Sequence, residues 1–373
     1  MNPPLFAAPA NEAELVEAIS TARDERRTVE LRGAGTRAAV GDPGRERAII
    51  DMGGFAGIID YEPTELVLTV GAGTPLAEVE RLLAANGQML AFEPHGGTIG
   101  GVMAAGASGP RRPFAGGVRD HLLGVEGVSG RGEAFKAGGR VVKNVTGYDL
   151  PRLMTGSWGR LAAITSLSVK VLPKGRAEAT VMVEGLDDAP ALALLARAAG
   201  SAAEISGAAH IPGMGTAMRL EGFGPSVAAR VEMLRGLCAS SGEARLIEGD
   251  GSPALWREVR DASGLPQDLP LWRVTAPAAS GARLTADLGD AARLYDWAGG
   301  LVWIAAPESV DVRAAASAVG GQAMLVRASD EMRARIGALH PEAAGVAALR
   351  SRIKAGFDPA GVLDPERFGK AQI

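Results

Sequence analysis

The stretch GGTIGGVMAAGASGPRRPFAGG, residues 96–117, constrains this chain of 373 residues more than any other feature. Its glycines and other small residues leave little side chain between the backbone and a ligand. Consecutive backbone N–H groups of such a loop can donate to a diphosphate. Arg111 and Arg112 could add positive charge there, or form an ordinary exposed basic pair. The stretch therefore predicts a phosphate-binding segment.

Two copies of the sequence GAGT, at 33–36 and 71–74, are further candidate phosphate loops. The first follows a predicted strand and fits the glycine pattern of nicotinamide-binding Rossmann units, but glycines and a proline soon after it break the helix which that fold requires. The second leads directly into a predicted helix with Thr74 as N-cap and Pro75 at its first position, which also describes any well-capped helix. Spacing alone leaves open which copy holds a phosphate.

The predicted elements divide the chain into two domains, as its length suggests. An amphipathic helix over 11–27, capped by Asn11, is followed by short strands separated by glycine-rich turns. Beyond Arg176 the pattern changes to strand–helix–strand units with fewer glycines. We therefore predict a domain boundary near residues 173–176.

Composition excludes several classes of protein. A net charge of −4 and an aromatic content of 4% argue against a nucleic-acid partner, which requires a basic surface and stacking platforms. The single cysteine, Cys238, precludes an internal disulfide and agrees with a reducing compartment. It lies in a helical pattern and is expected to be buried. No signal peptide or transmembrane segment is predicted, so we expect a cytoplasmic protein.

Four motifs together carry a family resemblance. They are RGAGT, TIGGVMAAGASGPRRPFAGGVRDHLLGV, VKNVTGYDLPRLMTGSWGRLAAITSLSVKVLP and FDPAGVLDPERF. The series resembles the vanillyl-alcohol-oxidase type of FAD-binding flavoproteins, and within that family the FAD-binding subunits of bacterial glycolate oxidases. The resemblance covers residues 1–173 closely, the tail well and the middle weakly.

The resemblance implies an α+β fold with a two-subdomain FAD-binding domain over residues 1–173 and a smaller α+β cap over residues 174–330. A C-terminal segment, residues 331–373, would return to the FAD-binding domain. The first GAGT copy would then be the FAD pyrophosphate loop, and the second a turn between a strand and a helix. Because the first loop contains neither His nor Cys, the FAD should be bound non-covalently. The residues implied to bind FAD come from the first loop, from the glycine-rich stretch around the pyrophosphate and isoalloxazine, and from the adenine side: Gly33, Gly35, Thr36, Arg37, Thr98, Gly100, Gly101, Ser108, Gly109, Gly159 and Ile164.

The four histidines do not form the paired motif by which related 2-hydroxy-acid dehydrogenases hold a divalent metal. No metal site is therefore predicted. His210 and His340 are expected at the surface or in loops, whereas His95 and His121 could act beside the flavin.

Other polar residues near the motifs receive no catalytic assignment. Tyr148 and Asp149 are predicted to share a buried hydrogen bond, with acid–base chemistry as the alternative. Lys143 could lie near the flavin or in solvent. Asp364 stands where the family usually has Asn, which leaves a polar contact in the tail open.

The resemblance implies an FAD-dependent oxidoreductase acting on CH–OH donors, as one subunit of a glycolate oxidase complex. Such a subunit would oxidise glycolate, a small 2-hydroxy acid, to glyoxylate and relay electrons through its flavin. The implied partners are a larger flavin subunit and an iron–sulfur subunit, since one cysteine cannot hold a cysteine-ligated cluster. Through them the chain could reach the cytoplasmic face of the inner membrane. Two alternatives remain open: a stand-alone FAD oxidase of another alcohol or hydroxy acid, and a non-catalytic assembly subunit.

Overall fold

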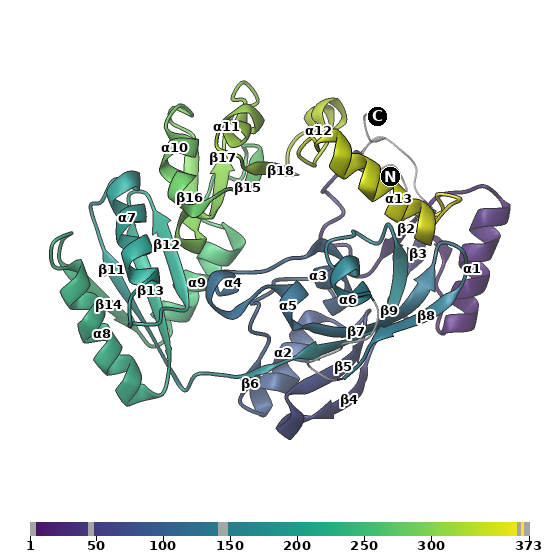
Figure 1. The fold of residues 1–373 in the computed structure, drawn as a ribbon, viewed down its shortest axis with the longest axis horizontal. Coiled ribbons are helices and arrows are strands. Elements are labelled where there is room, and N and C mark those ends of the chain that lie inside the picture. The colour runs from purple at the N-terminus through teal and green to yellow at the C-terminus, as the bar shows by residue number, and fades with distance from the viewer. Residues whose placement is uncertain (1–4, 44–47, 141–147, 364–366, 369–373) are drawn as a thin grey trace.

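A computed structural model describes residues 5–43, 48–140, 148–363 and 367–368. It contains two lobes that lie side by side, the N-terminal one in purple and blue and the second in green (Figure 1). Both helices and sheets occur in each lobe, which confirms the predicted α+β class. Among the described residues, no helix combines the length and the apolar character needed to cross a bilayer.

The N-terminal lobe begins with a small parallel sheet of strand order β1-β3-β2. Its strands are β1 (Leu5–Ala7), β2 (Val29–Arg32) and β3 (Ala48–Asp51). Helix α1 (Glu12–Asp24) begins at the predicted cap, where Asn11 Oδ1 accepts from the Glu14 N–H at 3.0 Å. The buried face of α1 packs on this sheet in a core that also includes Val128 and Ala163 of the neighbouring sheet. This core joins the two sheets of the lobe.

The second sheet of this lobe is antiparallel, with strand order β4-β5-β9-β7-β8. Its strands are β4 (Ile58–Glu62), β5 (Val67–Gly71), β7 (Leu122–Ser129), β8 (Ala134–Gly138) and β9 (Ala162–Lys170). The short strands β6 (Gln88–Met89) and β10 (Leu172–Pro173) form a separate pair. The helical elements are η1 (Pro63–Glu65), α2 (Leu76–Ala85), α3 (Ile99–Ala105), α4 (Arg112–Ala115), α5 (Val118–His121) and α6 (Leu150–Met154). Residues from α2, α3 and α6 pack on this sheet in one apolar core.

The second lobe is built on an eight-stranded antiparallel sheet of order β14-β11-β13-β12-β16-β17-β15-β18. Its strands are β11 (Ala177–Val183), β12 (Gly207–Ile211), β13 (Gly215–Gly222), β14 (Ala244–Glu248), β15 (Leu271–Thr275), β16 (Ala292–Asp296), β17 (Leu301–Ala305) and β18 (Gln322–Arg327). The helical elements are α7 (Asp188–Ala199), α8 (Gly224–Cys238), α9 (Gly251–Asp261), η2 (Ala278–Ser280), α10 (Gly281–Thr285), η3 (Trp297–Gly299) and α11 (Val312–Ala318).

Two apolar cores hold this sheet to its helices. One core contains residues of α7, α8, α10 and α11, including the fully buried Cys238, as expected for that residue. The other core contains residues of α9 together with Trp297 and Trp303. Because side chains alternate along a strand, the sheet can serve both cores at once.

The chain then returns to the first lobe through α12 (Asp330–Ile336) and α13 (Ala344–Phe357), drawn in yellow above β2 and β3 (Figure 1). Beyond α13, the buried Asp358 carboxylate accepts from the N–H groups of Val362 and Leu363. The Val29 N–H in turn donates to the Val362 carbonyl at 2.8 Å. The C-terminal segment is therefore tied to the edge of the parallel sheet.

Candidate functional site

The first GAGT copy forms the loop that leaves β2. Gly35 has a φ of +69°, a left-handed conformation that side chains disfavour. The N–H groups of residues 33–37 donate to no acceptor among the described residues. A run of backbone N–H groups that includes a left-handed residue is a typical anion-binding arrangement. Because these N–H groups lack acceptors among the described residues, the loop fits a pyrophosphate.

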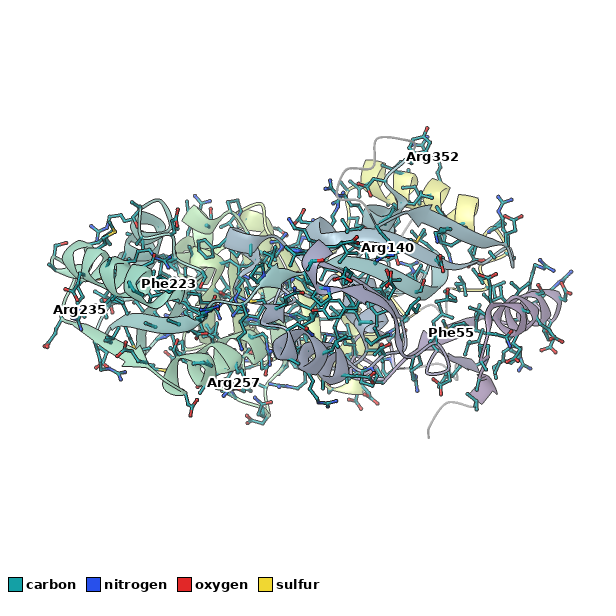
Figure 2. The ribbon with its side chains drawn as sticks, turned by 90° about the horizontal axis from the view of Figure 1, so that it is seen from below. Phe55, Arg140, Phe223, Arg235, Arg257 and Arg352 are labelled. Atoms are coloured by element: carbon teal, nitrogen blue, oxygen red, sulfur yellow. The ribbon has the colours of Figure 1, made fainter. Side chains whose placement is uncertain are left out.

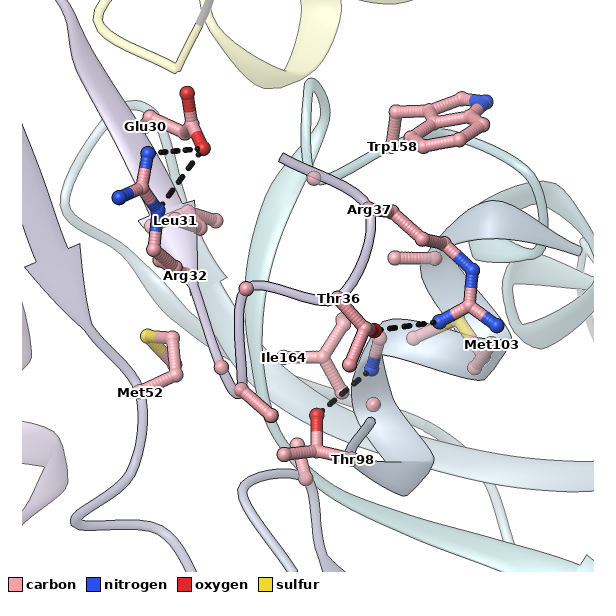
Figure 3. Close-up of a pocket in the computed structure, with 18 of the residues that line it drawn as sticks. Glu30, Leu31, Arg32, Thr36, Arg37, Met52, Thr98, Met103, Trp158 and Ile164 are labelled. Atoms are coloured by element: carbon pink, nitrogen blue, oxygen red, sulfur yellow. Dashed lines mark hydrogen bonds and ion pairs between the residues drawn. The ribbon is translucent and has the colours of Figure 1, made fainter. Parts of the chain in front are cut away.

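A pocket lies against this loop (Figure 3), and most of the predicted site residues line it. Its lining residues among those predicted are Gly33, Gly35, Thr36, Arg37, Thr98, Gly100, Gly101, Gly159 and Ile164. The structure thus brings together three separate motifs: the β2 loop, the start of α3 and the start of β9. Ser108 and Gly109 do not line the pocket.

The start of α3 forms one wall of the pocket, but its N–H groups are already bonded. The Ile99 and Gly100 N–H groups donate to Thr74 and Ala72 carbonyls, and the Gly101 N–H donates to Thr98 Oγ1 at 3.2 Å (Figure 3). A Cβ on Gly100 would lie 2.7 Å from the Ala72 carbonyl oxygen. Here glycine allows close packing of α3 on β5. In this part of the structure, the free N–H donors come from the β2 loop.

Two side chains outside the predicted set, Trp158 and Arg367, also line the pocket. Arg367 is buried, donates to the Val40 carbonyl at 2.6 Å and to the Arg37 carbonyl, and lies 5.4 Å from the Trp158 ring centre. Arg37 donates to the His95 carbonyl at 2.8 Å, and burial lowers the pKa of Arg37. Both Trp158 and Arg367 belong to quoted motifs, GSWGRL and LDPERF, so the motifs contained this signal.

Ser108 and Gly109 lie where the two lobes meet. Ser108 Oγ accepts from the Val118 N–H at 3.1 Å, and the Gly109 carbonyl accepts from Trp297 Nε1 at 3.0 Å. Arg111 is not available as a phosphate partner, because it pairs with Glu93 and Glu221. Arg111 therefore fits neither of the two alternatives that the sequence left open, free countercharge for a phosphate or an exposed basic residue.

Several local expectations differ from the structure. Thr74 is not the N-cap of α2; its buried hydroxyl donates to the Gly71 carbonyl at 2.7 Å and accepts from the Gly57 N–H. Tyr148 is 93% exposed, and Asp149 instead caps α6, so the expected buried Tyr–Asp bond is absent between these described residues. Lys143 and Asp364 lie outside the described residues.

Two histidines are buried in the structure. His210 is buried in β12, 3.0 Å from Thr216 Oγ1 and 3.4 Å from Asp188, rather than at the surface. His121 is buried too, and its Nε2 lies 2.7 Å from the Ala115 carbonyl. The described part of the chain contains no group of three or more His, Cys, Asp or Glu side chains placed to hold a metal ion.

Comparison with known proteins identifies the family to which this chain belongs. The FAD binding domain family matches residues 3–138. The glycolate oxidase subunit GlcE of Escherichia coli K12 is 34% identical over 361 residues, covering 95% of this chain and 96% of that protein. The D-lactate dehydrogenase of Archaeoglobus fulgidus is 31% identical over 172 residues, covering 45% of this chain and 38% of the enzyme. The glycolate oxidase subunit GlcD of Bacillus subtilis is 29% identical over 193 residues, covering 50% of this chain and 41% of that subunit.

Solved structures agree on the fold. An alkyldihydroxyacetonephosphate synthase structure superposes with a TM-score of 0.70, at 15% identity, over 96% of this chain and 75% of its own. Fold, loop and matches together define an FAD-binding protein. The chain belongs to the vanillyl-alcohol-oxidase-type family of FAD-linked oxidoreductases, in the group that contains the glycolate oxidase subunit GlcE.

Proposed function

We propose that this chain is the FAD-binding subunit of a glycolate oxidase assembly. The observation that supports FAD binding most directly is the run of N–H groups at 33–37 without an acceptor among the described residues. The similarity to GlcE supports the glycolate assignment, because it extends over nearly the full length of both chains. The reaction is oxidation of glycolate to glyoxylate, with the electrons passed onward.

We also propose that the eleven residues named from the resemblance contact FAD, and that Trp158 and Arg367 join them. The β2 loop would bind the pyrophosphate through its N–H groups. Gly159 and Ile164, which also line the pocket, would face the adenine side. When bound, FAD accepts a hydride from a CH–OH donor and can release its electrons singly. The chain's own part is to hold and orient the cofactor and to exclude water from its reactive face.

The division into residues 1–173, 174–330 and 331–373 is kept as a proposal. It is supported by the sheets, since β11 to β18 form one sheet that shares no strand pairing with those of the first lobe. The middle part would be the cap over the flavin.

The proposed partners are a larger flavin subunit and an iron–sulfur subunit. A chain with one cysteine cannot supply the ligands of a cysteine-held cluster, so electrons that leave FAD singly require another protein as acceptor. We propose that the assembly works in the cytoplasm or at the cytoplasmic face of the inner membrane.

The test compares the purified chain with the chain purified together with its partners. Acid precipitation should release FAD into the supernatant, because the β2 loop contains no His or Cys to form a covalent link. Glycolate turnover, at equal flavin concentration and with an artificial acceptor, should be orders of magnitude faster in the full assembly. Comparable rates would favour a stand-alone oxidase, and protein without redox-active flavin would favour an assembly subunit.

A further inference from the structure

The contact between the two lobes contains an unusual set of charges. Trp297, at the end of β16, donates its indole N–H to the Gly109 carbonyl of the first lobe. Arg260 of α9 donates to the Pro94 carbonyl at 3.3 Å. Pro94 and Gly109 of the first lobe therefore lie directly against the second lobe.

One part of this contact is balanced in charge. Glu93 pairs with Arg111 and Arg219, and Glu221 pairs with the same two arginines, with N···O distances from 2.7 to 3.4 Å. Burial would raise the pKa of Glu221, but hydrogen bonds and charge from Arg111 and Arg219 lower it to about 2. Two carboxylates thus neutralise two guanidinium groups, and neither carboxylate is left for another cation.

Next to it lie two cations without such partners. The guanidinium carbons of Arg112 and Arg273 lie 4.4 and 5.0 Å from the centre of the Trp297 ring. Neither arginine forms an ion pair or a side-chain hydrogen bond with any described residue. Burial, and then the charge of Arg112, lower the pKa of Arg273 to about 10. Two like charges share one indole because cation–π attraction offsets part of their repulsion.

The carboxyl group nearest in sequence does not supply the missing charge. Asp296 precedes Trp297, is buried, and accepts from the Trp297 N–H at 2.7 Å. Burial raises the pKa of Asp296, whereas the charges of Arg219 and Arg273 act to lower it. Among the described residues, the Asp296 carboxylate bonds the Trp297 N–H and forms no ion pair with Arg112 or Arg273.

We propose that Arg112, Trp297 and Arg273 form an anion site that binds the carboxylate of a small organic acid. Arg112 is exposed and Arg273 is partly buried, so a small solute can reach the site at the Arg112 guanidinium group. A guanidinium donates two parallel N–H groups to a carboxylate, whereas the flat indole offers an apolar surface to a carbon skeleton.

One residue, His95, relates this site to the pocket at the β2 loop. The His95 carbonyl accepts from Arg37, which lines that pocket. Burial lowers the pKa of His95, and the charges of Arg37 and Arg273 lower it further. Under the proposed function, on which this inference rests, the bound acid would be the 2-hydroxy acid substrate held beside the flavin.

The test measures binding of oxalate, a two-carbon carboxylate with no C–H bond to oxidise, to the FAD-containing full chain by calorimetry. Arg273→Met should weaken oxalate binding by about tenfold or more, the scale of a hydrogen bond to a charged group. Arg273→Lys keeps the positive charge but not the two parallel N–H donors, so it should weaken oxalate binding less than Arg273→Met does. Arg112→Met should also weaken oxalate binding. The matched control is Arg257→Met, since Arg257 is exposed on α9 at the surface of the same lobe (Figure 2) and should bind oxalate as the unchanged chain does.

Unaltered oxalate affinity in both Arg273 variants and in Arg112→Met would overturn the proposal. Binding of inorganic phosphate in place of oxalate would also overturn it, because it would assign a different anion. If Arg273→Met fails to fold, as its melting curve would show, Arg273→Lys and Arg112→Met carry the test. Failure of the proposed function is detected separately, by flavin content and by turnover of the full assembly.

Discussion

The two GAGT copies have the same four residues, but only one of them has its backbone N–H groups bonded to described residues. In the second copy, the N–H groups of Gly71, Ala72, Gly73 and Thr74 all donate to backbone carbonyls, at 2.9 to 3.0 Å. In the first copy, the N–H groups of Gly33, Ala34, Gly35 and Thr36 donate to no described residue. The second copy is buried, so its N–H groups need acceptors from the protein. The first copy is half-buried to exposed, so its N–H groups can bond a ligand or water.

The difference arises from what surrounds each copy. The second copy lies between β5 and α2. Its Gly73 packs so closely against the backbone of Met52 that a Cβ would be 2.4 Å from the Met52 carbonyl oxygen. The first copy leaves an edge strand of the small parallel sheet and turns into the pocket. The same motif therefore serves packing in one place and, we propose, ligand binding in the other.

The largest effect is expected from Gly35→Val. At a φ of +69°, a β-branched residue is strained by about 1–3 kcal/mol, and relaxation of the loop would redirect its N–H groups. The space itself is not blocked, since the nearest atom to a Cβ is Arg32 Cδ at 3.6 Å. We expect FAD affinity to fall by more than about 100-fold with most of the fold retained. Flavin titration of the variant, with circular dichroism as the folding check, measures this; full occupancy at normal affinity would place the pyrophosphate elsewhere.

Gly73→Val should show the reverse pattern. Its side chain would meet the Met52 carbonyl and Gly53, both backbone, so the neighbouring chain has to shift. We expect a loss of about 2–3 kcal/mol in the free energy of unfolding, while the molecules that remain folded keep their FAD. Chemical denaturation and the flavin-to-protein ratio of the folded fraction test this. A variant of normal stability that has lost its flavin would reverse the roles of the two copies.

A smaller contrast is expected at the two threonines. Thr74→Val removes a buried hydroxyl and leaves the Gly57 N–H without its acceptor, so unfolding should become easier by about 1–3 kcal/mol. Thr36→Val should change stability by less than about 0.5 kcal/mol, since Thr36 is exposed and its one described hydrogen bond, from Arg37, is 3.4 Å long. Melting curves of the two flavin-free variants compare them. Equal losses would show that the first loop is as firmly packed as the second.

Local patterns in the sequence predicted the elements well. Asn11 caps α1 as expected, because an N-cap depends only on residues within one turn. Thr74 looked equally suited to cap α2, yet its hydroxyl bonds Gly57 and Gly71 instead. That choice depends on how β5 meets the preceding loop, which no local pattern contains.

The sequence likewise predicted some residues of the site but missed the pairings between the lobes. Motifs placed Gly35, Thr98 and Gly159 in one pocket, because glycines and caps at fixed positions mark backbone that must approach a ligand. They did not reveal that Arg111 is paired across the lobes with Glu221, 110 residues away, or that Arg273 shares Trp297 with Arg112. Such partners are brought together only by packing of the two lobes.

Hydrogen–deuterium exchange of the backbone, in flavin-free and FAD-reconstituted protein, tests the central claim most directly. We predict that the N–H groups of residues 33–37 exchange rapidly without FAD and become protected when FAD is bound, because the pyrophosphate supplies their missing acceptors. Residues 71–74 should be protected in both states, since carbonyls of the protein already accept from them. Unchanged exchange at 33–37 on FAD binding, or new protection at 71–74 instead, would contradict the account.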